Sequence, residues 1–201
     1  MHQDGKREEI SGGGLSRVEE ELRAILGPSE TLTADQPIIV LKDYEMFAAA
    51  WNGCRRRLHV IRDLERKKSD AAWPGGGNGF EPGYFDESIE GSAGEVAVAK
   101  YLNCYWDYSV NTWQDPDLAG FIQVRTRSKF WHDLNVRWKD AEHEVFVLVT
   151  GRMPTYCLRG WAYGHEAKRD EYLKNPGGFH PAFFMPQKDL RPMATLKEMI
   201  R

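Results

Sequence analysis

The longest regular pattern of apolar and polar positions lies in residues 43–68 and predicts an amphipathic helix. Asp43 is a suitable N-cap for this helix. The apolar positions recur at spacings of four and three residues and are Phe47, Trp51, Cys54, Leu58 and Ile61. Because this spacing places them on one side of a helix, we expect this apolar stripe to be buried against the rest of the protein.

A second helix is predicted from Ser92 to Leu102, and most of the chain after it has the pattern of strands. Alternating, β-branched or aromatic residues predict strands at 106–113, 121–127, 134–138 and 156–163. The continuous apolar run at 145–150 is typical of a central strand buried on both faces. Helical segments are predicted at 166–173 and 194–200.

This order of elements predicts an α/β (α+β) fold in which a mixed central sheet of four to five strands is flanked by helices. The 201 residues suffice for one domain with a true core. Residues 1–36 are polar and contain three consecutive glycines, so we expect a flexible N-terminal arm followed by a single domain at 37–201. Residues 74–79 and 175–178, rich in Gly and Pro, are predicted loops.

Composition narrows the classes of function. No apolar stretch approaches the ~20 residues that cross a bilayer, and the N-terminus lacks the apolar core of a signal peptide, so we expect a cytoplasmic protein without membrane contact. Three cysteines without a C-x-x-C pair indicate reduced, mostly buried thiols rather than disulfides or a zinc cluster. A formal net charge of −3 restricts any nucleic-acid site to a local basic patch.

The segment 115–127 carries the residues best suited to chemistry. Asp, Pro and Gly make its first half a turn, and its second half enters a strand. Side chains alternate along a strand, so Gln123, Arg125 and Arg127 share one polar, cationic face near the carboxylate of Asp117. An acid, a neutral oxygen ligand and a fixed cation suit metal-assisted hydrolysis of a phosphodiester, in which Arg125 binds the phosphate.

In this segment the chain resembles the PD-(D/E)XK nuclease superfamily: it has an acid at a turn, then a glycine, then a polar residue two positions before a cation on the next strand. The resemblance covers about residues 92–163. It implies a restriction-endonuclease-like core of a helix, three strands, a helix and a strand. It also implies cleavage of DNA with Mg²⁺ or Mn²⁺. The compact, diverged nucleases of phages and mobile elements are the members that this chain is most similar to.

The resemblance implies a role for each matching position. Asp117 corresponds to the first acid, Gln123 to the second, Arg125 to the lysine, and Glu95 to the helix acid that many members add to the metal shell. The backbone carbonyl of Val124 completes the implied shell. Gln123 and Arg125 depart from the family pattern, because an amide carries no negative charge and a guanidinium is never deprotonated. We therefore expect weaker metal binding than in typical members.

Two of these positions have alternative interpretations. Ser92 and Glu95 also fit a capping box, in which the Glu side chain only binds the cap backbone. The position of Glu95 on the same helix side as Val98 and Leu102 instead favours a site near the sheet. Asp115 is an alternative to Asp117 as the metal acid, although its place in the turn favours a structural role.

Two basic groups are candidates for contacts with nucleic acid. The first follows one side of the predicted helix 43–68 and consists of Arg55, His59, Arg62 and Arg66. The second surrounds Trp131 and His132 and consists of Arg125, Arg127, Lys129 and Arg137. The first group also fits a solvated helix surface. His132 either donates a proton to a leaving oxygen or ends a turn, and the tryptophans at 106, 113, 138 and 161 are expected in the core.

The sequence thus leads to a metal-dependent DNA endonuclease or exonuclease with a diverged active site. The alternative is a nuclease fold with a lapsed site that binds nucleic acid or a protein partner, which Gln123 and Arg125 favour. A third possibility is an inhibitor or accessory protein in which the Asp-Pro-Asp turn at 115–117 is purely structural.

Overall fold

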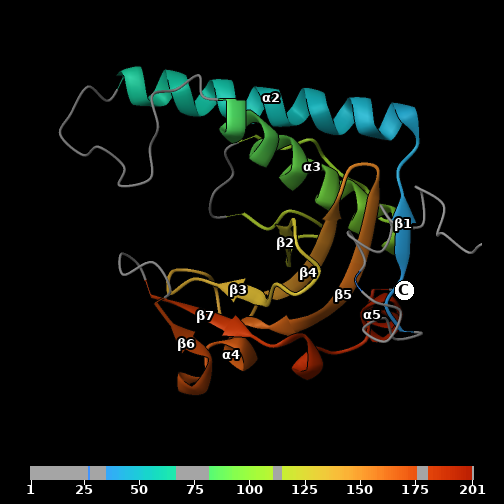
Figure 1. Ribbon diagram of the computed structural model, residues 1–201, viewed down its shortest axis with the longest axis vertical. Coiled ribbons are helices and arrows are strands. Elements are labelled where there is room, and N and C mark those ends of the chain that lie inside the picture. Colours follow the sequence, from blue (N-terminus) through green and yellow to red (C-terminus); the bar gives the residue numbers. More distant parts are fainter. Residues whose placement is uncertain (1–26, 28–34, 67–81, 111–114, 176–180, 201) are drawn as a thin grey trace, which may run out of the picture.

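The computed structural model describes residues 27, 35–66, 82–110, 115–175 and 181–200 (Figure 1). Its α-helices are α2 (Asp43–Arg66), α3 (Pro82–Leu102), α4 (Gly164–Ala167) and α5 (Met193–Met199). Its strands are β1 (Ile38–Val40), β2 (Ile122–Arg127), β3 (Leu134–Val136), β4 (Val145–Arg152), β5 (Thr155–Tyr163), β6 (Leu173–Lys174) and β7 (Ala182–Met185). Single 3-10 turns cover Asp170–Tyr172 and Gln187–Asp189.

The strands form two sheets. The larger has the order β1-β5-β4-β2, in which β2 runs parallel to β4 and the other pairs are antiparallel. The smaller has the order β3-β7-β6 and is antiparallel. This mixed four-stranded sheet flanked by helices confirms the predicted α/β (α+β) class. In the larger sheet β2 is an edge strand, so one side of its backbone lies outside the ladder.

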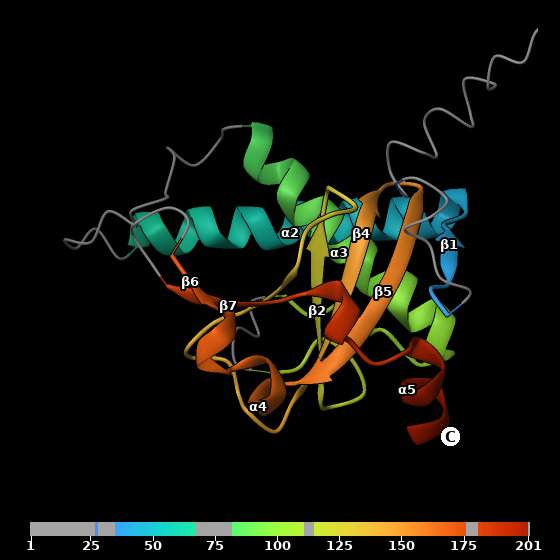
Figure 2. The same ribbon diagram turned by 60° about the horizontal axis from the view of Figure 1, so that its bottom comes forward.

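Helix α3 lies between α2 and the larger sheet. The smaller sheet lies on the opposite face of the larger sheet (Figures 1 and 2). Strand β4 supplies side chains to both sides: Val145, Val147 and Val149 belong to the core beneath α3. Phe146 and Leu148 belong to a second core shared with β3 and β7. The prediction that the run 145–150 is a central strand buried on both faces is confirmed.

The prediction that the apolar stripe of α2 is buried is wrong for most of its length. Phe47 is 76 % exposed, Trp51 54 % and Leu58 39 %. Helix α2 instead turns small residues toward α3, because the two helix backbones approach closely. A Cβ added at Gly53 would lie 2.5 Å from Cα of Ile89. Close backbone contact at a glycine therefore decides which face of α2 is covered, and the large side chains remain outside.

Helix α3 begins at Pro82, ten residues before the predicted start at Ser92. Pro is favoured in the first turn of a helix, where its missing N–H is not needed. Ser92 is buried within the helix, so the capping-box interpretation of Ser92 and Glu95 is wrong. Glu95 therefore occupies the middle of a helix that packs on the sheet.

Other differences concern the segments around the strands. The described part of the predicted strand 106–113 is irregular chain, and 111–114 lie outside the described residues. Trp106 and Trp161 are buried as expected, whereas Trp138 is 56 % exposed because β3 ends at Val136 and a turn follows. The segment 166–173 contains the end of α4, a 3-10 turn and the first residue of β6. Strands β1, β6 and β7 were not predicted.

Most of the predicted arm at 1–36, the loop at 74–79, Trp113 and most of the linker at 175–178 lie outside the described residues. Cys54, Cys104 and Cys157 are free thiols, the last of them buried. Among the helices that the structure describes, none has both the length and the apolar character needed to span a bilayer.

The contact between α3 and β2 provides a test of the fold around Glu95. A Cβ at Gly94 would lie 1.9 Å from Oγ1 of Thr126 and 3.0 Å from its Cβ, so Gly94→Ala forces helix and strand apart. We expect a loss of about 1–3 kcal/mol in the free energy of unfolding, measured by urea denaturation. Gly91→Ala is the matched control: nothing lies within 4 Å of the added Cβ, and we expect a gain of up to about 1 kcal/mol. Equal effects at both positions would contradict this packing.

Candidate active site

Glu95 is the centre of a buried ion pair between the two long helices. It is 4 % exposed on α3, and both of its carboxylate oxygens accept hydrogen bonds from Arg56 of α2. The distances are 2.5 Å from Nη1 to Oε1 and 2.7 Å from Nη2 to Oε2. The indole N–H of Trp106 also donates to Oε2, at 2.9 Å. A buried carboxylate requires such partners, and here they are Arg56 and Trp106.

Arg56 is a site residue that sequence reasoning missed. Burial alone lowers the pKa of its guanidinium, but the hydrogen bonds and negative charge of Glu95 outweigh this and raise the pKa overall. Its Nε donates to the carbonyl of Ser109 at 3.1 Å, which fixes the chain that leads from Trp106 toward β2. Its spacing from Gly53 could have identified it. Arg56 follows Gly53 by three residues and therefore lies on the face that α2 turns inward.

Asp117 lies in the turn before β2, as predicted. Its Oδ2 accepts a hydrogen bond from the backbone N–H of Val124 at 2.7 Å. In a strand the N–H and C=O of one residue point to the same side, so the carbonyl of Val124 also faces the side occupied by Asp117. The Leu118–Ile122 bridge closes this turn against the start of β2. A carboxylate and a backbone carbonyl thus meet beside the edge strand.

The carboxyl groups of Asp117 and Glu95 are close enough to repel each other. Burial and then the charge of Glu95 raise the pKa of Asp117 from 3.8 to about 7. The hydrogen bond from Val124 and the charges of Arg125 and Arg56 lower that pKa, but only in part. Strongly shifted acids in such surroundings are typical of functional sites. The two acids, which lie on different elements, are therefore within electrostatic reach of each other.

Gln123 and Arg125 point to the side of β2 that faces the second core. The guanidinium of Arg125 lies 5.1 Å from the ring centroid of Phe146, and its Nη1 donates to Oε1 of Gln123 at 3.3 Å. Its Nη2 forms an ion pair with Asp140 at 2.8 Å. Sequence reasoning missed Asp140, which also accepts the backbone N–H of Arg137. Arg125 is thus held in one position, within the electrostatic reach of Asp117.

The donors available to a cation are few. In the part of the chain that the structure describes, no three His, Cys, Asp or Glu side chains gather closely enough to hold a metal ion. The candidate ligands are the carboxylates of Asp117 and Glu95, the amide of Gln123 and the carbonyl of Val124. Asp115 is exposed, and its backbone carbonyl accepts the Gln123 amide at 3.4 Å, which fits the structural role expected for that turn residue.

A second feature is a surplus of hydrogen-bond donors at the end of β2 and in the loop after it. Among the described residues, Nε of Arg125, Nε of Arg127 and Nδ1 of His132 are buried without a hydrogen-bond partner. Burial and the charges of Arg127 and Lys129 lower the pKa of His132. The Lys129 ammonium lies 5.7 Å from the ring centroid of Trp131, which is 59 % exposed. These residues, from Arg127 to His132, form what we call the cationic loop, which suits an anion beside a stacking surface.

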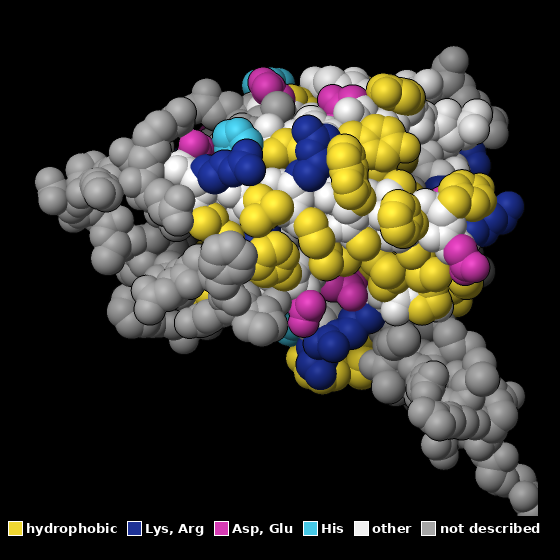
Figure 3. All heavy atoms as spheres, turned by 90° about the horizontal axis from the view of Figure 1, so that it is seen from above, with side chains coloured by type: hydrophobic (Ala, Val, Ile, Leu, Met, Phe, Trp, Pro, Cys, Tyr) yellow, Lys and Arg dark blue, Asp and Glu magenta, His cyan; other side chains and the backbone are white. Residues whose placement is uncertain are grey.

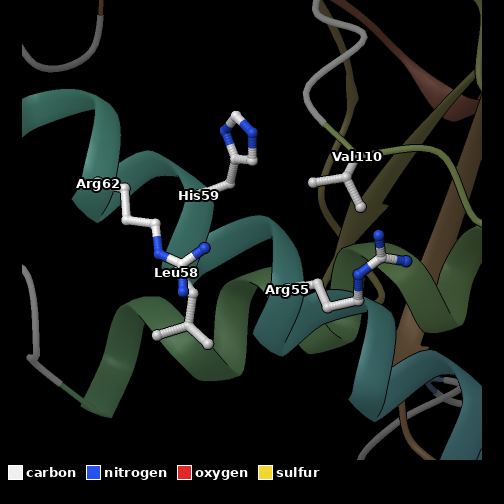
Figure 4. Close-up of a pocket in the computed structure, with 5 residues that line it drawn as sticks. All are labelled: Arg55, Leu58, His59, Arg62 and Val110. Atoms are coloured by element: carbon white, nitrogen blue, oxygen red, sulfur yellow. The ribbon is translucent and has the colours of Figure 1, made fainter. Parts of the chain in front are cut away.

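The first basic group lies outside the site. Arg55, His59 and Arg62 are exposed on α2 and line a groove of about 380 Å³ with Leu58 and with Val110 from the segment after α3 (Figure 4). The side chain of Arg66 lies outside the described residues. Arg137 is exposed next to Trp138. The predictions that these side chains contact nucleic acid stay predictions.

Comparison with protein-family models, with curated proteins and with solved structures gives no significant match to the chain. The chemistry of this site is therefore argued from its own residues.

The raised pKa of Asp117 predicts a pH dependence of stability. An acid whose pKa is about 7 in the folded protein and 3.8 when unfolded binds its proton more tightly in the folded state. The contribution of Asp117 to the free energy of unfolding is therefore greatest below pH 4. It falls by up to roughly 4 kcal/mol as the pH rises to 7. Asp117→Asn removes this dependence, because the amide does not titrate. Urea denaturation between pH 4 and 8 should show a smaller decline in the variant, and parallel curves would contradict the assignment.

Proposed function

We propose that the chain is a metal-dependent deoxyribonuclease, a phosphodiester hydrolase with a diverged PD-(D/E)XK site. The observation that carries this proposal is that Asp117, bonded to the backbone of Val124 on the edge strand β2, lies within electrostatic reach of the buried Glu95. Burial and the charge of Glu95 raise the pKa of Asp117 by more than Val124, Arg125 and Arg56 together lower it, so additional positive charge there would favour the ionised acid. A divalent cation would supply this positive charge.

Asp117, the Val124 carbonyl and the Gln123 amide would hold Mg²⁺ or Mn²⁺, with one oxygen of Glu95 as a further ligand. These are the oxygen donors that hard cations prefer. Such an ion lowers the pKa of a bound water and neutralises charge on the phosphate. Glu95 fits this role if Arg56 keeps one of its two hydrogen bonds and releases the other oxygen, while Trp106 continues to orient the carboxylate.

Arg125 would bind a phosphate oxygen or the charge that develops on the phosphate. Its ion pair with Asp140 and its position against Phe146 support a preorganised donor, since little reorganisation is then needed when charge develops. A guanidinium offers two parallel N–H groups to a phosphate, which the ammonium of a lysine does not.

The substrate side of the proposal rests on the cationic loop, which begins at the last residue of β2. Arg127, whose buried Nε has no hydrogen-bond partner, and the Lys129 ammonium carry the positive charges suited to backbone phosphates. Arg127 lies three residues beyond Val124, and a strand rises about 3.3 Å per residue, so the two are about 10 Å apart along β2. A DNA strand bound at Arg127 would therefore extend toward Asp117 within about three nucleotides.

The second candidate is a module that binds nucleic acid without cutting it. The specific observation in its favour is that Arg56 occupies both oxygens of Glu95. A guanidinium paired to an acid in this way supplies the positive charge that a metal ion otherwise brings. In that case Asp117 is left without Glu95 as a second ligand, and a single carboxylate with neutral oxygens holds a divalent cation weakly.

Asp117→Asn separates these functions. Plasmid, linear and single-stranded DNA are incubated with the protein in Mg²⁺, in Mn²⁺ and in EDTA. We expect cleavage that needs a divalent cation and that falls at least about 100-fold in Asp117→Asn, because the amide loses the charge that holds the ion. Asp115→Asn is the matched control, with the same chemical change two residues away on an exposed side chain, and should cut normally.

Cleavage that survives Asp117→Asn would remove Asp117 from the mechanism. No cleavage with any metal, together with DNA binding that persists in EDTA, would establish the binding module instead. Thermal stability gives an independent readout: the cation binds the deprotonated acids, so Mn²⁺ should raise the melting temperature more at pH 8 than at pH 5. That difference should vanish in Asp117→Asn.

The cationic loop predicts which charges contribute to DNA affinity. Arg127→Gln and Lys129→Gln should each weaken DNA binding in EDTA and lower the slope of log affinity against log salt by about 1. Lys197→Gln is the control, because it removes the same charge from α5. This helix packs against β5, which is separated from β2 by β4, so the slope should stay unchanged. Fluorescence anisotropy of a labelled duplex measures both quantities. Equal slopes in all variants would exclude the loop as the contact.

A further inference from the structure

The cationic loop presents an exposed indole ring beside its positive charges. Trp131 is 59 % exposed, and the ammonium of Lys129 lies over its ring, 5.7 Å from the centroid. The ring of Phe130 stands at 90° to the indole, with the two centroids 4.8 Å apart. These neighbours orient the indole and still leave more than half of the side chain open, so a flat apolar surface remains available to a ligand.

The backbone on both sides of Trp131 is held from a distant part of the chain. Gln187, in the 3-10 turn after β7, donates from Nε2 to the carbonyl of Phe130 at 2.5 Å and to that of His132 at 2.8 Å. The backbone N–H of His132 also donates to the carbonyl of Lys129, at 3.1 Å, which closes the turn. Binding costs less conformational entropy when the contacting segment is already ordered, so the indole is preorganised for a ligand.

The positive charge of the cationic loop is compensated only in part. Burial is the first cause of the lowered pKa of Arg127, and the charge of Glu87 offsets it incompletely. The charges of Arg127 and Lys129 in turn contribute to the lowered pKa of His132. Within the described residues, Nε of Arg127 and Nδ1 of His132 are buried without a hydrogen-bond partner. An anion bound at the loop would therefore meet a positive potential that the protein itself does not neutralise.

An open aromatic ring beside such cations suits a nucleotide whose base is unpaired. The phosphate interacts with the cations, and the base stacks on the ring. Within a duplex, neighbouring base pairs cover both faces of each base, so a side chain can stack on a base only after that base has left the helix. The ring therefore distinguishes a single strand from a duplex, whereas contacts to phosphates alone are present with both.

We propose that Trp131 stacks on an unpaired base, so that the protein binds single-stranded DNA, or the single-stranded end of a duplex, in preference to fully paired DNA. This inference rests on the proposed function for DNA as the ligand and deepens it by naming the form of the substrate. Arg127 and Lys129 bind the adjacent phosphates. Arg127 is the last residue of β2, so a strand anchored at the loop approaches the candidate site along β2.

Fluorescence anisotropy of labelled oligonucleotides in EDTA tests the inference without any cleavage. The wild-type chain should bind a single strand more tightly than a blunt duplex of the same length. Trp131→Ala should weaken single-strand binding at least about fivefold and leave duplex binding unchanged. Because stacking releases no counterions, this variant should keep the wild-type slope of log affinity against log salt, unlike Arg127→Gln and Lys129→Gln.

Trp51→Ala is the matched control, because Trp51 also combines an exposed indole with a cation. It is 54 % exposed, and the guanidinium of Arg55 lies 4.6 Å from its ring centroid. Trp51 belongs to α2, which α3 separates from the larger sheet; Figure 3 looks onto this side of the molecule and shows apolar side chains among basic ones. The loss of Trp51 should leave single-strand affinity unchanged.

Two further variants separate stacking from simple apolar contact. Trp131→Phe retains an aromatic ring and should weaken single-strand binding by less than about threefold. Trp131→Leu retains an apolar side chain without a ring and should weaken it as much as Trp131→Ala does. Equal binding by the Phe and Leu variants would overturn stacking as the contact, and so would equal losses in Trp131→Ala and Trp51→Ala.

The remaining outcomes separate this inference from the proposed function. Tighter binding of the duplex than of the single strand overturns the preference, and tighter binding of RNA of the same sequence overturns DNA as the ligand. A chain that cuts no DNA with any metal, but whose single-strand preference depends on Trp131, overturns the proposed nuclease alone. A chain that cuts DNA and whose single-strand binding is indifferent to Trp131→Ala overturns this inference alone.

Discussion

The buried ion pair of Arg56 and Glu95 is the interaction on which the architecture of the site depends. It joins α2 to α3 across 39 residues of sequence, and the same guanidinium holds the chain at Ser109 that leads toward β2. Removing either partner would leave a charge without compensation in a place that water hardly reaches, which is far more costly than losing both. The pair also sets the charge near Asp117, because Glu95 raises and Arg56 lowers the pKa of that acid.

The edge position of β2 is the second constraint. A central strand uses both sides of its backbone in ladders, whereas β2 pairs with β4 on one side and leaves the N–H and C=O of Val124 available on the other. Asp117 satisfies that N–H from the preceding turn. An edge that carries open carbonyls beside acids is unsuited to further strand pairing, but it suits a cation. The turn thus protects the edge and builds the candidate site at the same time.

How far the sequence could predict this arrangement depends on the range of the interactions. Periodicity predicted β2, β4 and β5 because burial on one face leaves an alternating pattern in β2 and burial on two faces leaves a continuous apolar run in β4. Alternation along β2 also placed Gln123 and Arg125 on one side, and they do contact each other. Arg56 and Asp140 were not predicted, because their partners, Glu95 and Arg125, are distant in sequence and a charged residue has no pattern that reveals which acid it meets. The buried face of α2 was misassigned because close backbone contact at Gly53 outweighs side-chain size.

Strand β4 lies between two cores, and each of its side chains from Val145 to Val149 is fully buried in one of them. Its backbone also pairs on both sides, with β2 and with β5. Exposing its amides to solvent therefore requires that both cores open together. These amide hydrogens should exchange with deuterium at the rate of global unfolding, whereas those of β1 and the smaller sheet can exchange through local openings.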